Sequence, residues 1–328
     1  MAREWRMKSF PGGLPTAENF ALIETKLPPL ADGQIRVRNG WLSIDPAVRW
    51  RMQRSTSIVP LRPGDAIEAP AIGEVVETRS PRFAVGDKIS HHQGWRDEAV
   101  VDDREALHLP AIDVAPEAFL GQLGLPGLTA YVGLIDIAGT KAGDIVFISA
   151  AAGAVGLAAI QIAKNCGAIV VGSAGGAEKC ALVKKFGADA AIDYKSSGSL
   201  EAKLMAAAPG GIDVYFDNVG ASHLDSALLA ARNKARFAIC GMISEYNEGQ
   251  PSSYANLRRL ISANITMRGF RVGEHTHRLA DFHRDAAIWI SSGRFATLET
   301  VRFGLEEVPA AFRELFIGSN RGKMVVKI

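Results

Sequence analysis

The spacing of hydrophobic and polar residues divides the chain into two parts. Near the N-terminus, short apolar runs such as 34–39 and 72–77 alternate with glycine and proline pairs, a pattern typical of β-strands joined by turns. From about Pro126 onward, apolar runs suited to buried strands alternate with helical stretches. The first part therefore predicts a compact, mainly β domain, and the second predicts an α/β domain.

The second part predicts strands and helices in the doubly wound order of a parallel sheet. The expected strands cover 145–148, 169–171, 190–193, 212–216, 236–240 and 265–270. The expected helices cover 126–137, 154–165, 178–186, 200–207, 224–231 and 256–263. Because the strands of such a sheet direct their C-terminal ends at the ligand, the residues at those ends are candidates for a site. They are Ser149, Ser173, Asn218, Cys240 and Phe270.

A candidate phosphate-binding turn lies between the first expected strand and the helix 154–165. Its residues Ala151, Gly153 and Gly156 match the spacing G-x-G-x-x-G, with alanine in the first place. Small residues let the backbone approach a pyrophosphate, whose charge would sit at the N-terminus of the helix. A Gly/Ala-rich packing turn is the alternative interpretation. The strand before the motif and the helix after it favour the nucleotide site.

The residues after 169–171 distinguish between the two nicotinamide cofactors. An NAD site normally carries an Asp or Glu there, which holds the ribose 2′-hydroxyl. This chain instead reads Gly-Ser-Ala-Gly-Gly over 172–176, followed by Lys179. A cation pairs with a 2′-phosphate, so the sequence predicts NADP. Glu178 is the rival ribose ligand, but an acid in the first turn of a helix is favoured by the helix dipole in any case.

The composition argues against several other classes of protein. The 328 residues include 37 Lys and Arg and 35 Asp and Glu, without the concentrated basic region that duplex nucleic acids require. The N-terminus lacks the apolar core of a secretory signal, so none is expected. The uncharged stretch 145–163 is interpreted as a strand plus a helix, and no membrane partner is expected. Three cysteines without a C-x-x-C spacing predict reduced thiols in a cytoplasmic protein.

Several longer motifs resemble those of one family. They are LSIDPAVRWRM at 42–52, LGLPGLTAY at 123–131, SAAAGAVG at 149–156, VGSAGGAEK at 171–179, FDNVG at 216–220, CGMISEYN at 240–247, MRGF at 267–270 and GSNRGK at 318–323. The chain resembles the zinc-independent medium-chain dehydrogenase/reductases, specifically the NADP-dependent prostaglandin, alkenal and curcumin reductases. The resemblance extends over nearly the whole chain. It implies a GroES-like substrate domain over 1–122, a Rossmann NADP-binding domain over 123–290, and a segment 291–328 that returns to the first domain.

The resemblance also implies which residues hold NADP. Lys179 and Tyr194 would flank the adenosine 2′-phosphate, and Asn218 would hydrogen-bond the ribose or the backbone. The residues themselves leave alternatives open, namely a strand-edge role for Tyr194 and an Asx-turn for Asn218. The pyrophosphate turn would consist of Gly153, Ala154, Val155 and Gly156. The nicotinamide half would be lined by Cys240, Gly241, Met242, Ile243, Ser244, Tyr246, Phe270, Arg271 and Val272, with Asn320 reaching the cofactor from the returning chain.

No catalytic metal is expected. The zinc of related alcohol dehydrogenases takes two cysteines and a histidine, but here no cysteine precedes Cys166 and no histidine separates Gly73 from Glu74. The histidine cluster 275–283 lacks a thiolate or carboxylate at a suitable spacing, so we interpret it as surface histidines. Without a metal to activate an alcohol, reduction of an activated C=C bond suits the site better.

Such a reduction requires a donor for the substrate's carbonyl oxygen. Hydride addition to the β-carbon of an α,β-unsaturated ketone or aldehyde gives an enolate, which a positioned hydroxyl stabilises. Tyr246 is the first catalytic candidate, because it follows a strand end expected beside the nicotinamide. Tyr254 is the second, although it also fits simple packing in a loop. A phenol with a pKa near ~10 donates a hydrogen bond at neutral pH.

The chain departs from the family where the substrate is expected. Family members usually read D-P-Y-M-R-G-R-M at 45–52, so a pocket tyrosine is replaced by Ala47 and a glycine by Trp50. The sequence therefore does not identify the substrate. The alternatives to an enone reductase are a quinone reductase of the same superfamily and a non-catalytic NADPH-binding protein. The resemblance further suggests a homodimer formed through exposed strand edges of the nucleotide domain.

Overall fold

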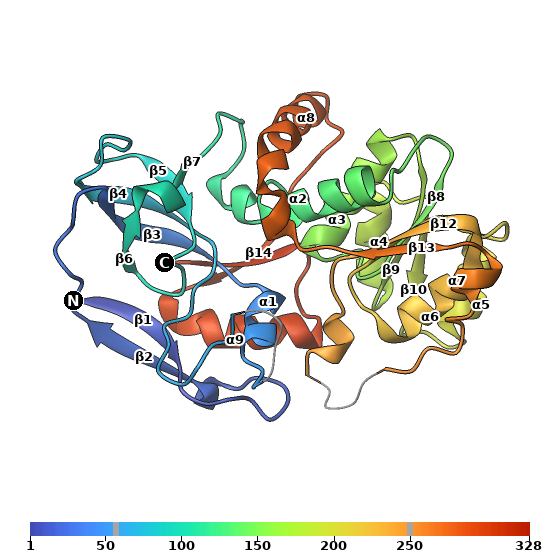
Figure 1. Ribbon diagram of the computed structural model, residues 1–328, viewed down its shortest axis with the longest axis horizontal. Coiled ribbons are helices and arrows are strands. Elements are labelled where there is room, and N and C mark those ends of the chain that lie inside the picture. Colours follow the sequence, from blue (N-terminus) through green and yellow to red (C-terminus); the bar gives the residue numbers. More distant parts are fainter. Residues whose placement is uncertain (55–58, 248–251) are drawn as a thin grey trace. The chain divides into compact units, whose positions relative to one another are not determined.

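The computed structural model describes residues 1–54, 59–247 and 252–328, which form two compact units (Figure 1). The first unit comprises Met1–Leu120 and Glu299–Ile328, and the second comprises Gly121–Leu298. Residues 291–298, which we expected in the returning segment, thus belong to the second unit. The reason is packing onto helix α8 (Leu279–Ser291), because the ring of Phe295 lies 6.4 Å from Phe282 and 6.1 Å from Trp289.

The first unit is mainly β, as predicted. Its larger sheet has the strand order β14-β15-β3-β4-β5-β7, with β6 paired to β3, and β1 pairs separately with β2. The strands are β1 Ala2–Met7, β2 Phe20–Thr25, β3 Gln34–Ser43, β4 Ala71–Thr78, β5 Lys88–His91, β6 Glu98–Asp102, β7 Leu107–His108, β14 Glu299–Phe303 and β15 Lys323–Lys327. The helices include α1 Pro46–Arg51 and α9 Val308–Ile317, with short 3₁₀ turns at η1 Ala17–Asn19, η2 Asp103–Glu105, η3 Pro116–Leu120 and η7 Leu305–Glu307.

The two ends of the sequence share one hydrophobic core within this unit. The ring of Trp95 lies 5.7 Å from Phe20 on β2 and 5.2 Å from Phe312 on α9. All three rings are buried, and the indole of Trp95 donates to the carbonyl of Ser43 at 3.1 Å. Because Phe312 comes from the C-terminal segment, that segment completes the core of the N-terminal domain.

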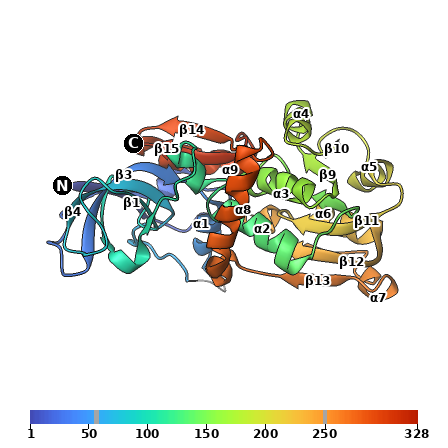
Figure 2. The same ribbon diagram turned by 90° about the horizontal axis from the view of Figure 1, so that it is seen from above.

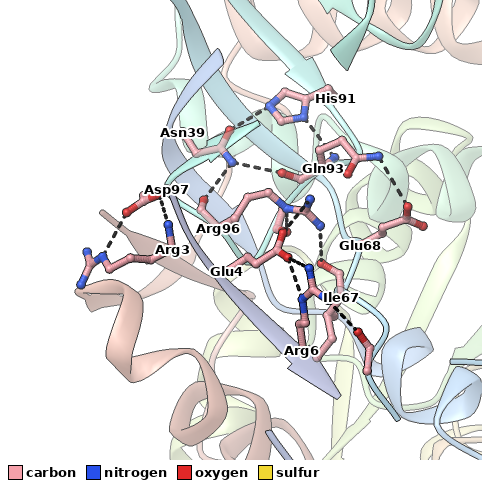
Figure 3. Close-up of polar contacts among 12 residues, drawn as sticks. Arg3, Glu4, Arg6, Asn39, Ile67, Glu68, His91, Gln93, Arg96 and Asp97 are labelled. Carbon is pink, nitrogen blue, oxygen red and sulfur yellow. Dashed lines mark hydrogen bonds and ion pairs between the residues drawn. The ribbon is translucent and has the colours of Figure 1, made fainter. Parts of the chain in front are cut away.

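A buried ion pair links β1 to the loop before β6 (Figure 3). The carboxylate of Glu4 pairs with Arg96 at 3.2 Å (Oε2 to Nη1) and with Arg6 at 2.6 Å (Oε1 to Nη2). Glu4 and Arg96 are both buried, and Arg96 also donates to the carbonyl of Ile67 at 3.4 Å. Each charge therefore has partners that offset the cost of taking it out of water.

His91 lies beside this ion pair and is buried as a neutral imidazole (Figure 3). Its Nδ1 accepts from the amide of Gln93 at 3.0 Å, so its Nε2 carries the proton and donates to Oδ1 of Asn39 at 2.8 Å. Burial, assisted by the neighbouring His92 and Arg96, lowers the pKa of His91 from 6.5 to about 3. The folded protein therefore keeps this ring uncharged over most of the acidic range.

The second unit is a doubly wound α/β domain, as predicted, around a parallel sheet of order β10-β9-β8-β11-β12-β13. Figure 2 shows β10 and β13 at opposite edges of this sheet. The strands are β8 Ile145–Ile148, β9 Ile169–Ala174, β10 Ala190–Asp193, β11 Ile212–Asp217, β12 Ala231–Ile239 and β13 Thr266–Gly269. The helices are α2 Leu125–Tyr131, the π-helix η4 Val132–Ile137, α3 Ala154–Asn165, α4 Ala177–Lys185, α5 Leu200–Ala207, α6 Ala221–Ala230, α7 Arg259–Ser262 and α8, with 3₁₀ turns at η5 Ile243–Glu245 and η6 Val272–Arg278.

Several predicted element boundaries were wrong. Strand β9 extends past 171 to Ala174, because residues 171–174 pair with β10 and this pairing outweighs the low strand preference of Gly, Ser and Ala. Helix α6 begins at Ala221 and ends at Ala230, where β12 begins earlier than expected. Helix α7 covers only 259–262, and the second half of the expected helix 126–137 is a π-helix.

Three packed aromatic rings form the centre of the second core, one pair stacked and one pair edge to face. Phe147, Tyr215 and Phe237 come from the adjacent strands β8, β11 and β12, and neighbouring ring centroids are 5.2 Å apart. Helices α5 and α6 cover this face of the sheet through buried leucines such as Leu204 and Leu224. In the described parts of the chain, no helix combines the length and apolar character needed to cross a membrane.

We predict that the free energy of unfolding decreases as the pH is lowered, because His91 is buried in its neutral form. Below a pH of 6.5 the unfolded chain protonates this histidine, whereas the folded protein does so only near a pH of about 3, so the unfolded state binds more protons. The free energy of unfolding should therefore decrease as the pH falls between these values. Urea denaturation at several pH values would measure this slope. His91→Gln should make the slope shallower, and a slope equal to that of the wild type would contradict the prediction. His277→Gln, at an exposed position in the second unit, is the matched control.

Candidate functional site

The turn between β8 and α3 holds the backbone close to the start of the helix. Ala150 has a φ of +47°, in the left-handed region that favours glycine. Ala151, the first residue of the predicted motif, is buried and donates its amide to the carbonyl of Ser173 at 2.8 Å. A Cβ on Gly156 would lie only 2.5 Å from the carbonyl oxygen of Ala150. Glycine at 156 is therefore what lets α3 pack directly on the turn.

The first residues of α3 form a site suited to an anion. Gly153 is the N-cap residue and has no side chain to bond the first amides of the helix. Gly153, Ala154 and Val155 are partly exposed, whereas most of the helix beyond them is buried. The partly exposed start of the helix and the positive end of its dipole together favour a phosphate group at this position.

Asp217, at the end of β11, is the most heavily bonded carboxylate of this region. Its Oδ1 accepts from the hydroxyl of Tyr215 at 2.7 Å and from the hydroxyl of Ser149 at 3.1 Å. It also accepts from the amides of Val219 at 2.8 Å and Gly220 at 2.9 Å. One buried oxygen thus connects the ends of β8 and β11 to the turn before α6.

The environment of Asp217 has opposing effects on its pKa. Burial raises the pKa of this carboxyl group, while the hydrogen bonds to its charged form lower it, and the balance is a raised pKa. Among the described residues, its second oxygen Oδ2 is buried and has no hydrogen-bond partner. The sequence analysis missed this residue, although a carboxylate that follows a buried apolar strand was a usable signal.

Asn218 does not form the Asx-turn that was the alternative interpretation of this residue. Its side-chain amide donates to the carbonyl of Ser149 at 2.7 Å, and its backbone amide donates to the hydroxyl of Ser149 at 2.8 Å. The turn is made instead by Asp217, as described above. Asn218 therefore lies beside the β8–α3 turn, at the edge of the sheet where a ligand is expected.

The predicted segment 240–244 lies against this edge. The thiol of Cys240 contacts the carbonyl of Asp217 at 3.1 Å and Oδ1 of Asn218 at 3.2 Å. The amide of Ile243 donates to the carbonyl of Asn218 at 3.2 Å, and the hydroxyl of Ser244 donates to Val219 at 2.6 Å. Burial and the nearby carboxylate raise the pKa of the Cys240 thiol, so Cys240 acts as a packing and hydrogen-bonding group and not as a thiolate.

Small residues bring this segment close to its neighbours. A Cβ on Gly220, whose φ is +74°, would lie 2.9 Å from Cε of Met242. A Cβ on Gly241 would lie 3.4 Å from the hydroxyl of Tyr246 and 3.6 Å from the carbonyl of Asn218. The hydroxyl of Tyr246 therefore lies next to the backbone of residue 241.

The two candidate catalytic tyrosines are in different environments. Burial raises the pKa of Tyr246, so its hydroxyl stays protonated and able to donate at neutral pH. Tyr254 already donates its only proton to Oε1 of Glu245 at 3.0 Å. Burial and this carboxylate raise the pKa of Tyr254 as well.

Lys179 and Tyr194 lie in the segments that follow β9 and β10. Lys179 is half-buried in the first turn of α4, and Tyr194 directly follows β10. The hydroxyl of Tyr194 would lie 2.9 Å from a Cβ on Gly175, so it reaches back over the loop after β9. Its ring also packs edge-on against buried His223 at 5.3 Å.

The remaining predicted cofactor residues come from two different segments, the one after β13 and the one before β15. Phe270 donates its amide to the carbonyl of Ile239 at 3.2 Å, which holds it beside the end of β12. Arg271 is exposed and ion-paired with Glu274, and Val272 begins η6. Asn320 lies in the other unit, where its amide donates to the carbonyl of Gly322 at 3.0 Å.

Two family models match the chain. One, described as the N-terminal domain of oxidoreductases, matches residues 3–109, and the other, described as zinc-binding dehydrogenase, matches residues 154–287. The second description names zinc, but the described residues contain no group of three His, Cys, Asp or Glu side chains that could hold a metal ion.

Curated relatives match over almost the full length. Prostaglandin reductase 1 of Rattus norvegicus is 39% identical, with 99% of each chain covered. The chain belongs to the zinc-independent medium-chain dehydrogenase/reductase family. Within this family, the NADP-dependent 2-alkenal reductase of Nicotiana tabacum is 37% identical over 98% of this chain and 96% of that protein. The NADPH-dependent curcumin reductase of Escherichia coli (strain K12) is 34% identical over 99% and 96%. The family predicted from the sequence is thus confirmed.

The fold of this medium-chain reductase also matches a solved relative. The crystal structure of CurA from Vibrio vulnificus in complex with NADPH has a TM-score of 0.93 and 36% identity, with 99% of this chain and 98% of that chain covered. The predicted fold class, a Rossmann-type sheet with a separate mainly β domain, is confirmed.

We predict that Asp217 is essential for the integrity of this site. Asp217→Ala would leave four donors without their shared acceptor, two of them amides of the turn, and should lower the free energy of unfolding by about 3 kcal/mol. Asp217→Asn keeps an oxygen in the Oδ1 position and should cost about 1 kcal/mol or less. Chemical denaturation of both variants checks the prediction, and equal losses would contradict it.

Proposed function

We propose that this protein is an NADPH-dependent reductase of the C=C bond of α,β-unsaturated ketones or aldehydes. The observation that carries the proposal is the convergence of Asn218, the segment 240–244 and Tyr246 on the end of the sheet beside the β8–α3 turn. Relatives of this chain over nearly its full length carry the names 2-alkenal reductase and curcumin reductase. Their activities and this geometry support the same reaction class.

The residues present fit NADPH. The partly exposed residues 153–155 at the start of α3, together with the dipole of that helix, would bind the pyrophosphate. Lys179 and Tyr194 would bind the 2′-phosphate over the carboxylate-free loop 172–176. The line of main-chain contacts from Asn218 to Ser244 would border the nicotinamide half. When bound, NADPH supplies the hydride.

The chain's own contribution to the chemistry is to hold the substrate's carbonyl oxygen. Hydride addition at the β-carbon leaves negative charge on that oxygen, and a positioned donor stabilises it. We assign this role to Tyr246, because its buried hydroxyl keeps its proton and lies beside Gly241. Tyr254 is less suited, because its proton is donated to Glu245.

We further infer that the protein is cytoplasmic and forms a homodimer. The three cysteines are unpaired, which is typical of a reducing compartment. Strand β13 lies at an edge of the parallel sheet, and its residues Thr266, Arg268 and Gly269 are exposed. An exposed strand edge can pair with the same edge of a second copy.

We predict that Lys179 makes the enzyme prefer NADPH. Lys179→Met should raise the KM for NADPH by roughly tenfold, since a charge-assisted contact to a phosphate is lost, and should leave the KM for NADH unchanged. Steady-state turnover of a short acyclic enone, followed by NADPH absorbance, measures both constants. Lys184→Met, at the other end of α4, is the matched control. An unchanged KM for NADPH in Lys179→Met would refute the assignment.

The same assay tests the reaction class. Turnover of the enone with NADPH is the expected result. A clear preference for a quinone over the enone would favour a quinone oxidoreductase. Measurable NADPH binding without turnover of either compound would favour a non-catalytic binding protein.

We predict that removal of the Tyr246 hydroxyl slows the chemical step. Tyr246→Phe should lower kcat for the enone by about 100-fold, the effect of losing one oxyanion donor, with little change in the KM for NADPH. Tyr254→Phe should keep kcat within about twofold, because that hydroxyl serves Glu245. Full activity in Tyr246→Phe would exclude the proposed role.

A further inference from the structure

The turn after β10 is held in place from both sides. Oδ1 of Asp193 accepts from the amide of Gly176 at 2.8 Å and from the amide of Lys195 at 2.9 Å. The ammonium of Lys203 donates to the carbonyl oxygens of Asp193 at 2.9 Å and Ser196 at 2.7 Å. Asp193 therefore ties the turn 193–196 to the glycine loop after β9. Lys203, which lies on α5, holds the same turn through two of its carbonyl oxygens.

The side chains of this turn lie over the glycine loop. A Cβ on Gly175 would lie 2.9 Å from the hydroxyl of Tyr194 and 2.8 Å from Cε of Lys195. Both distances are shorter than real Cβ atoms show, so a side chain at position 175 would displace these two groups. The ammonium of Lys195 is one bond beyond this Cε atom, which brings it to the same loop as the Tyr194 hydroxyl.

The charge of Lys195 is not used by the fold. Within the described parts of the chain, no carboxylate forms an ion pair with Lys195, and its side chain is exposed. The nearest acid in sequence, Asp193, is occupied by backbone amides, which lower its pKa. By contrast, Lys164 pairs with Asp189 at 2.9 Å and Lys323 pairs with Asp45 at 2.8 Å.

We propose that Lys195 is a second cation for the 2′-phosphate of NADPH, and that Asp193 is the residue that positions it. The inference rests on the proposed function, in which Lys179 and Tyr194 bind that phosphate. Lys179 lies in the first turn of α4, which follows the glycine loop in sequence, and Tyr194 and Lys195 reach Gly175 of that loop from the end of β10. A phosphate that carries close to two negative charges is then held from two sides.

Binding of 2′,5′-ADP and 5′-AMP to the full chain tests the proposal, because the two probes differ only in the 2′-phosphate. Calorimetric titration at low salt should show that Lys195→Met weakens 2′,5′-ADP binding by about fivefold and leaves 5′-AMP unchanged. Lys195→Arg should restore most of the affinity. Lys184→Met, which removes the same charge elsewhere on the domain, should bind both probes like the wild type.

The role of Asp193 has its own pair of variants. Asp193→Ala should lose selectivity for 2′,5′-ADP over 5′-AMP to about the same extent as Lys195→Met. The reason is that the turn carrying Lys195 loses the acceptor of its two amide hydrogen bonds. Asp193→Asn keeps an acceptor for the two amides and should retain the selectivity. Addition of Lys195→Met to Asp193→Ala should give little further loss, because Asp193 acts through the turn that carries Lys195.

The outcomes separate this inference from the proposed function. If Lys179→Met weakens 2′,5′-ADP binding while Lys195→Met does not, Lys195 is not a ligand and the inference is wrong, but the proposed cofactor site stands. If neither substitution changes binding, or the wild type does not distinguish the two probes, both the inference and the proposed 2′-phosphate site are wrong.

Discussion

The buried carboxylate of Asp217 is the constraint on which the proposed cofactor edge depends. It gathers two hydroxyls and two amides on one oxygen and so fixes the ends of β8 and β11 relative to the turn before α6. The arrangement is costly to disrupt, because a buried donor left without its acceptor costs roughly 1–3 kcal/mol. Asn218 and the segment 240–244 take their positions from this arrangement, since their main-chain partners lie in the residues that Asp217 holds.

Close approach of backbones is the second requirement of this edge. Gly156 lets α3 rest on the β8–α3 turn, and Gly172 lets α4 approach β9, where a Cβ would lie 2.6 Å from Val183. Gly175 leaves the space that Tyr194 and Lys195 occupy. Each glycine removes a steric barrier to this close approach. The loop 172–176 carries no carboxylate that would repel a phosphate.

Family motifs outside the nucleotide domain also have a structural explanation. The buried ammonium of Lys323, in the motif GSNRGK, donates to the carbonyl of Ile44 at 2.6 Å and to Asp45 at 2.8 Å, in the motif LSIDP. Burial lowers the pKa of Lys323, and the Asp45 carboxylate opposes this effect. This pair anchors the start of α1, on which Ala47 is exposed and Trp50 is half-buried. Ala47 and Trp50, where the chain departs from the family, therefore lie on a helix whose start is held by this buried pair.

The sequence by itself determined the class of fold, the order of the elements and the family. Strand β8 and helices α3 and α5 have the predicted limits, because local apolar runs and small-residue turns are properties of neighbouring residues. It did not determine where β9 ends or where β12 begins, because pairing with adjacent strands decides these limits. Nor did it identify Asp217 or Asp193, whose partners are brought together only by the sheet. Hydrogen bonding of a buried carboxylate depends on groups that are far apart in the chain, and only the tertiary structure brings them within reach.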